Sequence, residues 1–187
     1  MTNIFDVPAG DLIEEIAKEF EKNSEIKEPS FVNWVKSGSH RERAPHRKEW
    51  WYLRLASILY QTYKSGLVGT GRLRTYYGGR KARGVRKHRF RKSGGKIIRL
   101  SLQTLEQQGF IKKAKKGRTI TAKGEKFLAL KAKETMAGLG EKRRLAQENA
   151  IQREKERTER ESKEKRLVEG KKTEKDKHKK REKKKKT

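Results

Sequence analysis

The chain has 187 residues, of which 31% are hydrophobic and 41% are charged, and its formal net charge is +28. This composition is too polar for one compact globule of that length, and the charge predicts a polyanionic partner. The chain lacks cysteine, a membrane-length apolar run and a signal-peptide pattern, which excludes disulfides, thiolate chemistry and a membrane partner and predicts a soluble intracellular protein.

A change of composition near residue 141 predicts two parts. Residues 141–187 contain no aromatic residue and hold 21 basic and 11 acidic residues, so they cannot bury enough apolar surface to offset the entropy of ordering. We therefore expect a folded domain over residues 1–140 and a highly charged C-terminal extension over residues 141–187. The predicted domain is itself basic, because 31 basic and 13 acidic residues remain in it.

The first predicted helix follows Asp6 and Pro8, which supply a start signal, and it stops near Asn23. Its apolar residues fall on one helical stripe, made of Leu12, Ile13, Ile16, Ala17 and Phe20. Acidic residues lie off this stripe, and we expect them to face solvent or a protein neighbour because phosphate would repel them. These residues are Asp11, Glu14, Glu15 and Glu19.

A second, short helix is predicted after Pro29, with three buried side chains: Phe31, Trp34 and Val35. The polar segment 40–48 predicts a loop. The third helix is predicted over residues 49–65 and ends at Gly66. Its apolar stripe is expected to form the centre of the core and consists of Trp51, Leu55, Ile58, Leu59 and Thr62.

The fourth helix is predicted to start near Gly95 and to stop at Gly109, with Ile98, Leu102 and Leu105 buried. A short hairpin follows, with strands over residues 110–113 and 118–120. Thr121 then caps a last helix, whose apolar residues include Phe127, Leu128 and Ala132. This order predicts a mostly α, winged-helix-like bundle of about five helices with a small β-hairpin, although it also suits other small α+β folds.

The central stretch has a gap in its acidic residues. Between Glu49 and Glu106 there is no Asp or Glu, whereas the same stretch carries 14 Lys or Arg residues; the whole-chain frequency would place about seven acids there. Solvated basic faces usually mix both signs of charge. Charge of a single sign over consecutive elements indicates a partner that neutralises it, and RNA or DNA fits this requirement.

The densest basic segment, residues 72–92, combines arginine with glycine and aromatic residues. Glycine lets a backbone approach phosphate closely, arginine binds phosphate through two donors at once, and aromatic rings offer stacking surface for bases. Tyr77 and Phe90 are at least as well explained by ordinary packing. The candidate RNA-binding residues of this segment are Arg72, Arg74, Tyr76, Arg80, Lys81, Arg83, Arg86, Lys87, Arg89, Arg91 and Lys92.

Two predicted helices add further candidates for RNA binding. On the fourth helix, Lys96 and Arg99 lie opposite the apolar stripe. On the third, Trp50 and Arg54 are one turn apart, on a face turned away from Trp51. We expect Arg54 either to pair with phosphate or to stack on Trp50, and a purely structural cation–π role for that pair stays open.

Motifs for other functions are absent from the sequence. The glycines at positions 66, 69 and 71 are not followed by Gly-Lys-Ser/Thr, which argues against a nucleotide-binding loop. The four histidines have no metal-ligand spacing. Because the gap removes carboxylates from the central region, acid–base catalysis is not expected there. We therefore expect no enzyme activity, no metal, no cofactor and no small-molecule substrate.

Several motifs occur in a fixed order: Trp-Trp-Tyr-Leu-Arg-Leu-Ala-Ser at 50–57, Tyr-Gly-Gly-Arg at 77–80 with Gly-Val at 84–85, and Leu-Gln-Thr-Leu-Glu at 102–106. Pro-Ser-Phe-Val at 29–32, Ala-Pro at 44–45 and the stretch 117–124 extend the series. Together they resemble small-subunit ribosomal protein nineteen of the archaeal and eukaryotic type, the S-nineteen-e family. The resemblance covers roughly residues 5–137.

The resemblance implies a winged-helix-like fold, residence in the head of the small ribosomal subunit and a part in its assembly and maturation. It implies contacts to small-subunit ribosomal RNA by Trp50, Arg54, Arg80 and Arg99, and contacts to neighbouring small-subunit ribosomal proteins. The expected function is therefore that of a structural constituent of the cytoplasmic ribosome. The alternative is a winged-helix DNA-binding regulator, but here the charge is spread over a loop and two helices instead of one recognition helix.

The C-terminal extension departs from the family pattern. Acids placed four residues before bases favour a helix over about residues 141–166, through Glu156–Arg160, Glu159–Lys163 and Glu161–Lys165. Gly170 is expected to end this helix, and the lysine-rich remainder is expected to be disordered. A solvated tail and an extension that threads into RNA stay as alternatives.

Overall fold

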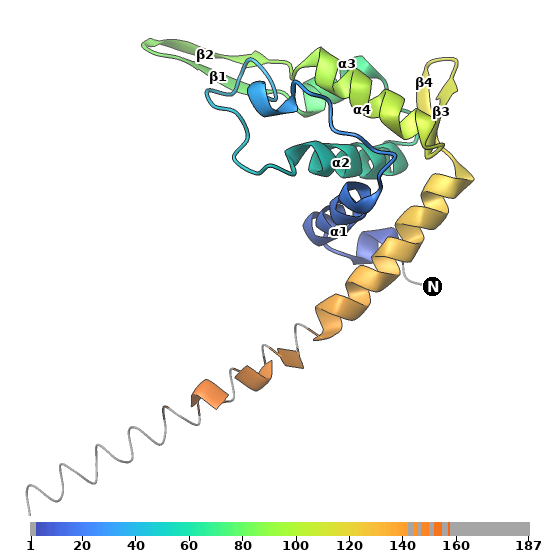
Figure 1. The fold of residues 1–187 in the computed structure, drawn as a ribbon. Coiled ribbons are helices and arrows are strands. Elements are labelled where there is room, and N and C mark those ends of the chain that lie inside the picture. The colour runs from blue at the N-terminus through green and yellow to red at the C-terminus, as the bar shows by residue number, and fades with distance from the viewer. Residues whose placement is uncertain (1–2, 142–143, 146, 150–151, 155–156, 158–187) are drawn as a thin grey trace, which may run out of the picture. The chain divides into compact units, whose positions relative to one another are not determined.

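The computed structural model describes residues 3–141, 144–145, 147–149, 152–154 and 157, and the chain divides into two compact units, Met1–Ala137 and Gly138–Thr187. Figure 1 shows the elements. The first unit contains the helices α1 (Ala9–Lys22), α2 (Trp50–Ser65), α3 (Thr70–Tyr76) and α4 (Gly95–Gln107), and then helical residues 122–137. Its strands are β1 (Gly79–Arg83), β2 (Arg86–Arg91), β3 (Ile111–Ala114) and β4 (Gly117–Ile120). Single-turn 3-10 helices lie at Ile4–Asp6 and Val32–Trp34.

Helix α2 occupies the middle layer of the first unit, with α1 on one side and α3 and α4 on the other (Figure 1). The stripe that was predicted to form the centre of the core is fully buried and consists of Trp51, Leu55, Ile58, Leu59 and Thr62. Thr62 is tolerated there because its hydroxyl donates to the carbonyl of Ile58 at 2.8 Å, which satisfies a buried polar group. The helix ends at Gly66, as the sequence predicts.

Helix α1 packs against α2 and buries the apolar side of its predicted stripe. The acids on its other side form ion pairs within the unit, namely Glu14–Arg47 at 2.8 Å, Glu15–Lys18 at 2.7 Å and Glu19–Lys131 at 3.2 Å. Both members of the first two pairs are exposed, so these two pairs contribute little to stability, whereas Lys131 of the third pair is mostly buried. They do neutralise basic residues on this side of the unit.

Helix α4 begins at Gly95 and buries the predicted Ile98, Leu102 and Leu105. An aromatic cluster then holds the last helix to α1. The ring of Phe20 lies parallel to that of Phe127 with 5.7 Å between centroids, and the Phe110 ring lies 5.0 Å from Phe127. Offset and tilted ring pairs at such distances add stability beyond their buried area.

The β3–β4 hairpin is the predicted wing. Its strands pair antiparallel, and Val68 joins β4 in an isolated bridge, exchanging two backbone hydrogen bonds of 2.9 Å with Arg118. The hydroxyl of Thr121 accepts a hydrogen bond from the amide of Gly124 at 3.3 Å and caps the last helix, as predicted. The mostly helical, winged-helix-like fold is thereby confirmed.

The segment after Pro29 differs from its prediction. It forms only the three-residue 3-10 turn Val32–Trp34, with Val32 buried and Trp34 86% exposed. A single turn is too short to place a second residue, three or four positions further on, on the same face. Only Val32 of this turn therefore enters the core. The prediction that Trp34 is buried is wrong.

Three elements were not predicted: α3 and the strands β1 and β2, which pair antiparallel. The strands leave no pattern in the sequence, because every residue of β2 is exposed and the period-two alternation of a half-buried strand is missing. Helix α3 has seven residues and one buried apolar side chain, Leu73, which is too little for a helical pattern.

In the second unit, residues 138–141, 144–145, 147–149, 152–154 and 157 are helical. The helix expected over residues 141–166 is thus observed at the described positions up to residue 157. The charge pairs from Glu156 to Lys165, the stop at Gly170 and the lysine-rich end lie outside the described residues. Among the described helices, none combines the length and the apolar character that crossing a bilayer requires.

Candidate nucleic-acid interface

The β1–β2 hairpin extends away from the helices (Figure 1). Its turn is made by Gly84, whose φ of 64° lies in the left-handed region that glycine adopts without steric cost. All six residues of β2 are exposed, and β1 alternates between exposed and half-buried positions. The hairpin therefore presents its side chains to a partner instead of covering a core.

The cross-strand pairs of the hairpin place like charges opposite one another. Lys81 faces Arg89, and Arg83 faces Arg86. Like charges directly opposite in an antiparallel pair are destabilising. The hairpin also holds no acid, since the whole stretch between Glu49 and Glu106 lacks one. Its charge therefore opposes its own pairing, which is typical of a surface selected for a binding partner.

The root of the hairpin is held by close packing. A Cβ added at Gly78 would lie 2.6 Å from the ring of Phe90 and 2.7 Å from the carbonyl oxygen of Arg91, so only glycine fits there. The hydroxyls of Tyr77 and Ser57 lie 2.8 Å apart in a hydrogen bond that joins this root to α2. Tyr77 therefore packs within the chain, as the alternative interpretation held. Phe90 touches Gly78 with its ring edge, but 56% of the residue stays exposed.

The predicted arginines of α3 have partners within the chain. Arg74 donates from Nε to the carbonyl of Ser93 at 3.2 Å, and Arg72 donates weakly from Nη1 to the carbonyl of Leu67 at 3.5 Å. The amide of Ser93 also donates to the carbonyl of Arg74 at 2.9 Å. Arg74 therefore ties α3 to the start of α4. Tyr76 is 60% exposed and offers a ring surface beside the hairpin root.

The predicted outer face of α4 is exposed. Lys96 places its ammonium 4.6 Å from the ring centre of Phe31, whereas Arg99 takes part in none of the ion pairs among the described residues. Arg80 of β1 donates to Nε2 of His88 at 2.6 Å, because a guanidinium can only donate. The other predicted basic residues of the hairpin and the following Lys92 are exposed or half-buried: Lys81, Arg83, Arg86, Lys87, Arg89 and Arg91.

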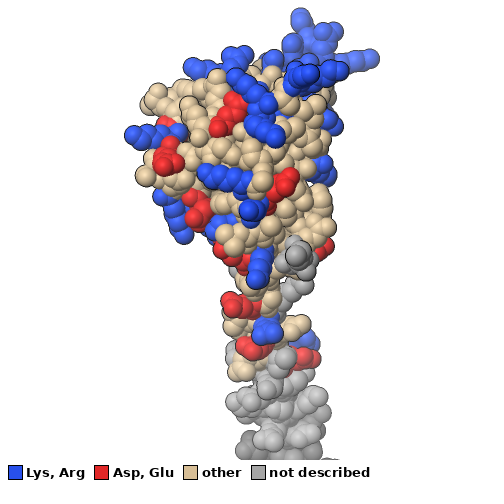
Figure 2. Space-filling model, turned by 90° about the vertical axis from the view of Figure 1, so that its right-hand side faces the viewer, with Lys and Arg blue, Asp and Glu red and all other residues tan. Residues whose placement is uncertain are grey.

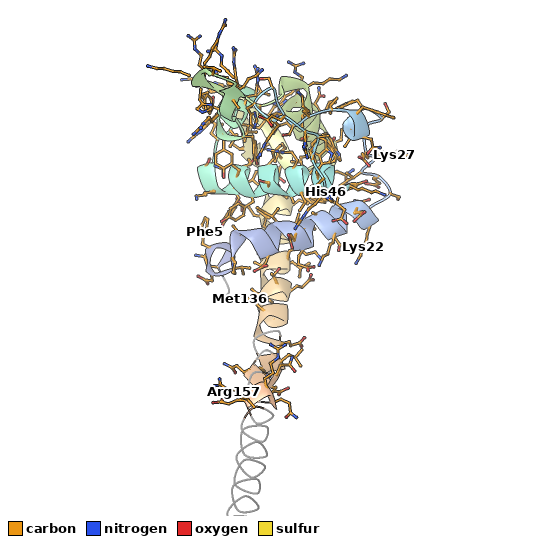
Figure 3. All side chains as sticks on the ribbon, turned by 90° about the vertical axis from the view of Figure 1, so that its left-hand side faces the viewer. Phe5, Lys22, Lys27, His46, Met136 and Arg157 are labelled. Atoms are coloured by element: carbon orange, nitrogen blue, oxygen red, sulfur yellow. The ribbon has the colours of Figure 1, made fainter. Side chains whose placement is uncertain are left out.

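We call the exposed or half-buried Lys and Arg side chains from Arg80 to Arg99 the basic surface. Figure 2 shows a dense cluster of Lys and Arg at the upper end of the molecule, with no acid within it. Figure 3, drawn from the opposite side, shows long nitrogen-tipped side chains spreading from the hairpin. The structure thus brings the hairpin residues of the predicted site together on one projecting element.

Two predicted residues, Trp50 and Arg54, lie elsewhere. They line a cavity of about 630 Å³ between α2 and the loop of residues 37–46. Trp50 is buried, and the Arg54 guanidinium carbon lies 4.0 Å from the ring centre of Tyr77. The predicted stacking of Arg54 on Trp50 is therefore wrong, because the ring within reach belongs to a residue 23 positions away in the sequence.

Arg54 is unusual in its surroundings. Burial lowers the pKa of Arg54 from its ordinary value, and the neighbouring Tyr77 opposes that shift. Burial also raises the pKa of Tyr77. The Nη1 atom of Arg54 is buried and has no hydrogen-bond partner among the described residues. A buried donor without an acceptor is rare in folded proteins.

The cavity also contains basic residues that the sequence did not single out: Arg41, Arg43 and His46. They belong to the segment 40–48, which was predicted only as a loop. The signal was present as an Arg-rich run, but Glu42 and Glu49 interrupt it, so it falls outside the acid gap. Among the described residues, no group of three His, Asp or Glu side chains is arranged to hold a metal ion.

Comparison with known proteins identifies the family. The profile described as "Ribosomal protein S19e" matches residues 3–138. A protein of Aeropyrum pernix named small ribosomal subunit protein eS19 is 42% identical over 142 residues, which cover 74% of this chain and 93% of that protein. The protein of the same name from Thermoplasma volcanium is 32% identical, covering 76% and 95%. Small ribosomal subunit protein eS19G of Ascaris suum is 37% identical, covering 68% and 87%. Because the profile spans nearly all of the first unit, the chain belongs to the ribosomal protein S19e family.

Proposed function

We propose that the chain is a structural constituent of the small ribosomal subunit, that it binds ribosomal RNA in the head of the subunit, and that it supports assembly and maturation there. Members of the S19e family are structural proteins of the cytoplasmic ribosome and not enzymes. Its partners are then small-subunit ribosomal RNA and neighbouring ribosomal proteins. The position in the head and the part in assembly rest on the family resemblance.

The observation that carries RNA binding is the hairpin with like charges opposite one another and no acid nearby. Phosphate groups would neutralise this charge and relieve the repulsion within the hairpin, so binding is favoured by it. The arginine forks supply two donors to each phosphate, and the exposed rings of Tyr76 and Phe90 offer stacking surface for unpaired bases. Lys96 and Arg99 extend the same chemistry onto α4.

A DNA-binding winged-helix regulator is not favoured. Such proteins place one recognition helix in the major groove. Here the charge is spread over the hairpin between α3 and α4 as well as over α4 itself. Family membership points in the same direction.

The test reverses charge on the hairpin and compares the result with a matched reversal elsewhere. The variant Arg89→Glu/Arg91→Glu should lower affinity for small-subunit ribosomal RNA by at least tenfold and reduce cosedimentation with small-subunit particles. The control Lys22→Glu/Lys27→Glu reverses two exposed bases at the end of α1 and just after it, which lie away from the hairpin in Figure 3. If both variants lost RNA affinity equally, the binding would reflect only a general attraction by net charge. If neither variant lost affinity, the docking surface would lie elsewhere.

A further inference from the structure

The β1–β2 hairpin has two faces, and both of them are open along β2. Successive side chains of a strand point to opposite faces, and residues paired across an antiparallel ladder share a face. The pair Lys81–Arg89 marks the first face. The pair Arg83–Arg86 marks the second, because Arg86 lies three positions from Arg89 in the same strand. All of β2 is exposed, so no other described element covers either face there.

Both faces are positively charged. The first face carries Lys81, Lys87, Arg89 and Arg91, and the second carries Arg80, Arg83 and Arg86 together with His88 and Phe90. The hydrogen bond of 2.6 Å between Arg80 and His88 agrees with this division, since only side chains on one face come so close. An arm that lay flat on RNA would need charge on the docked face alone. The like charges of a face left in water would only oppose strand pairing, so charge on both faces indicates phosphate on both sides.

The root of the hairpin is held on both faces. On the first face, a Cβ added at Gly79 would lie 3.0 Å from Cδ2 of His40. On the second face, the ring of Phe90 lies against Gly78 in the same way. These contacts fix the direction of the arm at its base, because His40 and Phe90 occupy the space that side chains at the two glycines would take.

The tip of the hairpin is open. A Cβ added at Gly84 would meet nothing within 4 Å among the described residues, and the next residue, Val85, is fully exposed. At about 3.4 Å per residue, strands of five and six residues give an arm of roughly 17–20 Å. Figure 1 shows this arm extending away from the helices. An apolar side chain at its end suits contact with bases more than contact with phosphates.

We propose that the β1–β2 hairpin inserts into the major groove of an RNA helix that an internal loop has widened, with one phosphate backbone along each face and Val85 foremost. The proposal rests on the proposed function and names the class of RNA that the basic surface binds. A continuous RNA helix does not admit the arm, because its major groove is deep and too narrow for side chains to read. A groove about 12 Å wide admits a two-stranded β-ribbon. The unpaired nucleotides of an internal loop open the groove and supply bases for Val85 to contact.

The first experiment maps what each face touches. The chain holds no cysteine, so a single one carries a short photocrosslinker at a chosen position. The variants are Lys87→Cys on the first face, His88→Cys on the second and Val85→Cys at the tip, all at exposed positions. In the complex of the full chain with small-subunit ribosomal RNA, positions 87 and 88 should crosslink to opposite strands of one helix, and position 85 to unpaired nucleotides between them. Lys22→Cys, at the end of α1, is the control and should give no crosslink to this helix.

The outcomes separate insertion from the proposed function on which it rests. Crosslinks from only one of positions 87 and 88, with the RNA bound, would overturn insertion and leave the proposed function standing. Crosslinks from both positions to a single strand, or to a continuous helix, would do the same. Failure of the wild-type chain to bind the RNA at all would overturn the proposed function, and insertion with it.

The second experiment compares a model RNA that contains the crosslinked internal loop with one in which complementary pairs close the loop. The wild-type chain should bind the looped RNA about tenfold more tightly. Lys87→Gln/Arg89→Gln removes two charges from the first face, and Arg83→Gln/Arg86→Gln removes two from the second. Each variant should lower affinity for the looped RNA by a similar factor of about ten and reduce the slope of log affinity against log salt by about 1.4–1.8. Neither should lower the melting temperature, since the removal of like charges relieves repulsion within the hairpin.

Lys22→Gln/Lys27→Gln is the matched control, because it removes two exposed charges away from the hairpin. It should change affinity by less than about threefold. A loss confined to one hairpin face, with the other variant within about twofold of wild type, would show an arm that lies flat on RNA and would overturn insertion. Equal affinity of the wild-type chain for the looped and the closed RNA would overturn it as well.

Discussion

Arg54 brings a positive charge into the packed region between α2 and Tyr77 without a carboxylate to receive it. A buried donor left without a partner costs about 1–3 kcal/mol. The contact with the Tyr77 ring returns about 0.5–2 kcal/mol of this. On these ranges the guanidinium is at best weakly stabilising in the free protein.

This comparison predicts the stability of Arg54→Met. The substitution removes the unpaired donor and keeps an unbranched side chain of similar reach, so the free energy of unfolding should stay equal or rise by up to about 1 kcal/mol. Urea unfolding of wild type and variant measures the difference. A loss of 2 kcal/mol or more would make the guanidinium a structural tie between α2 and Tyr77.

A second prediction at the residue scale separates folding from docking. Leu55→Ala should leave a cavity at the centre of the core and lower the free energy of unfolding by roughly 2–5 kcal/mol, because Leu55 is fully buried. Arg99→Glu should hardly change the melting temperature, since the side chain is exposed and pairs with no described acid. It should still weaken ribosomal RNA binding and incorporation into small-subunit particles. Unfolding of Arg99→Glu as severe as that of Leu55→Ala would make Arg99 a structural residue.

At the scale of elements, the β1–β2 hairpin differs from the β3–β4 hairpin. The wing is fastened to the body on several sides: Val68 bonds its backbone, and Arg118 donates to Glu106 of α4 at 2.7 Å in a half-buried ion pair. The first hairpin has its tight contacts at the root, and its strands oppose like charges. One hairpin thus belongs to the folded body, and the other is presented to a partner.

This difference predicts opposite effects of one substitution on stability and binding. Lys81→Glu places an acid directly opposite Arg89, which should stabilise the hairpin by about 0.2–1 kcal/mol. Affinity for RNA should nevertheless fall, because the acid repels phosphate. Lys81→Gln is the matched control, since it removes the repulsion without adding an acid. Stability is measured by amide exchange of β1 and β2, and affinity by titration; a rise in both would contradict the docking role of this strand.

At the scale of the whole molecule, charge is present in both parts of the chain. Residues 1–140 hold 31 basic and 13 acidic residues, and residues 141–187 hold 21 and 11. The family profile ends at residue 138, so the charged extension lies outside the part shared with the family. We infer that residues 1–140 fold and bind RNA by themselves and that the extension adds further phosphate contacts.

Salt titration tests this division. Each phosphate contact contributes about 0.7–0.9 to the slope of log affinity against log salt, so the full chain should show a slope of several units. A chain ending at residue 140 should keep its melting temperature and show a shallower slope that is still well above one. A slope near one in the full chain would contradict an extended basic surface. A large drop in melting temperature on truncation would contradict an independently folded first part.

The sequence by itself determined the elements that bury an apolar stripe. Helices α1, α2 and α4, the wing and the Thr121 cap were all predicted, because burial imposes a period on the residues and caps and glycines mark the ends. It also located the basic surface, because a missing acid is visible in the sequence without knowledge of the fold. Charge and periodicity depend on residues that are neighbours along the chain, so the sequence alone is enough to detect them.

The tertiary structure alone decided the rest. The β1–β2 hairpin carries no burial pattern, and its root is held by the close approach of Phe90 to Gly78. Trp34 was assigned to the core, but the single turn that carries it places Val32 there instead. Stacking on Trp50 was one of the two alternatives for Arg54, but the guanidinium lies over Tyr77 instead, and the cavity beside it needs a loop held at Ser37 and Arg47. Each of these depends on contacts between residues far apart in the sequence, and no local pattern encodes them.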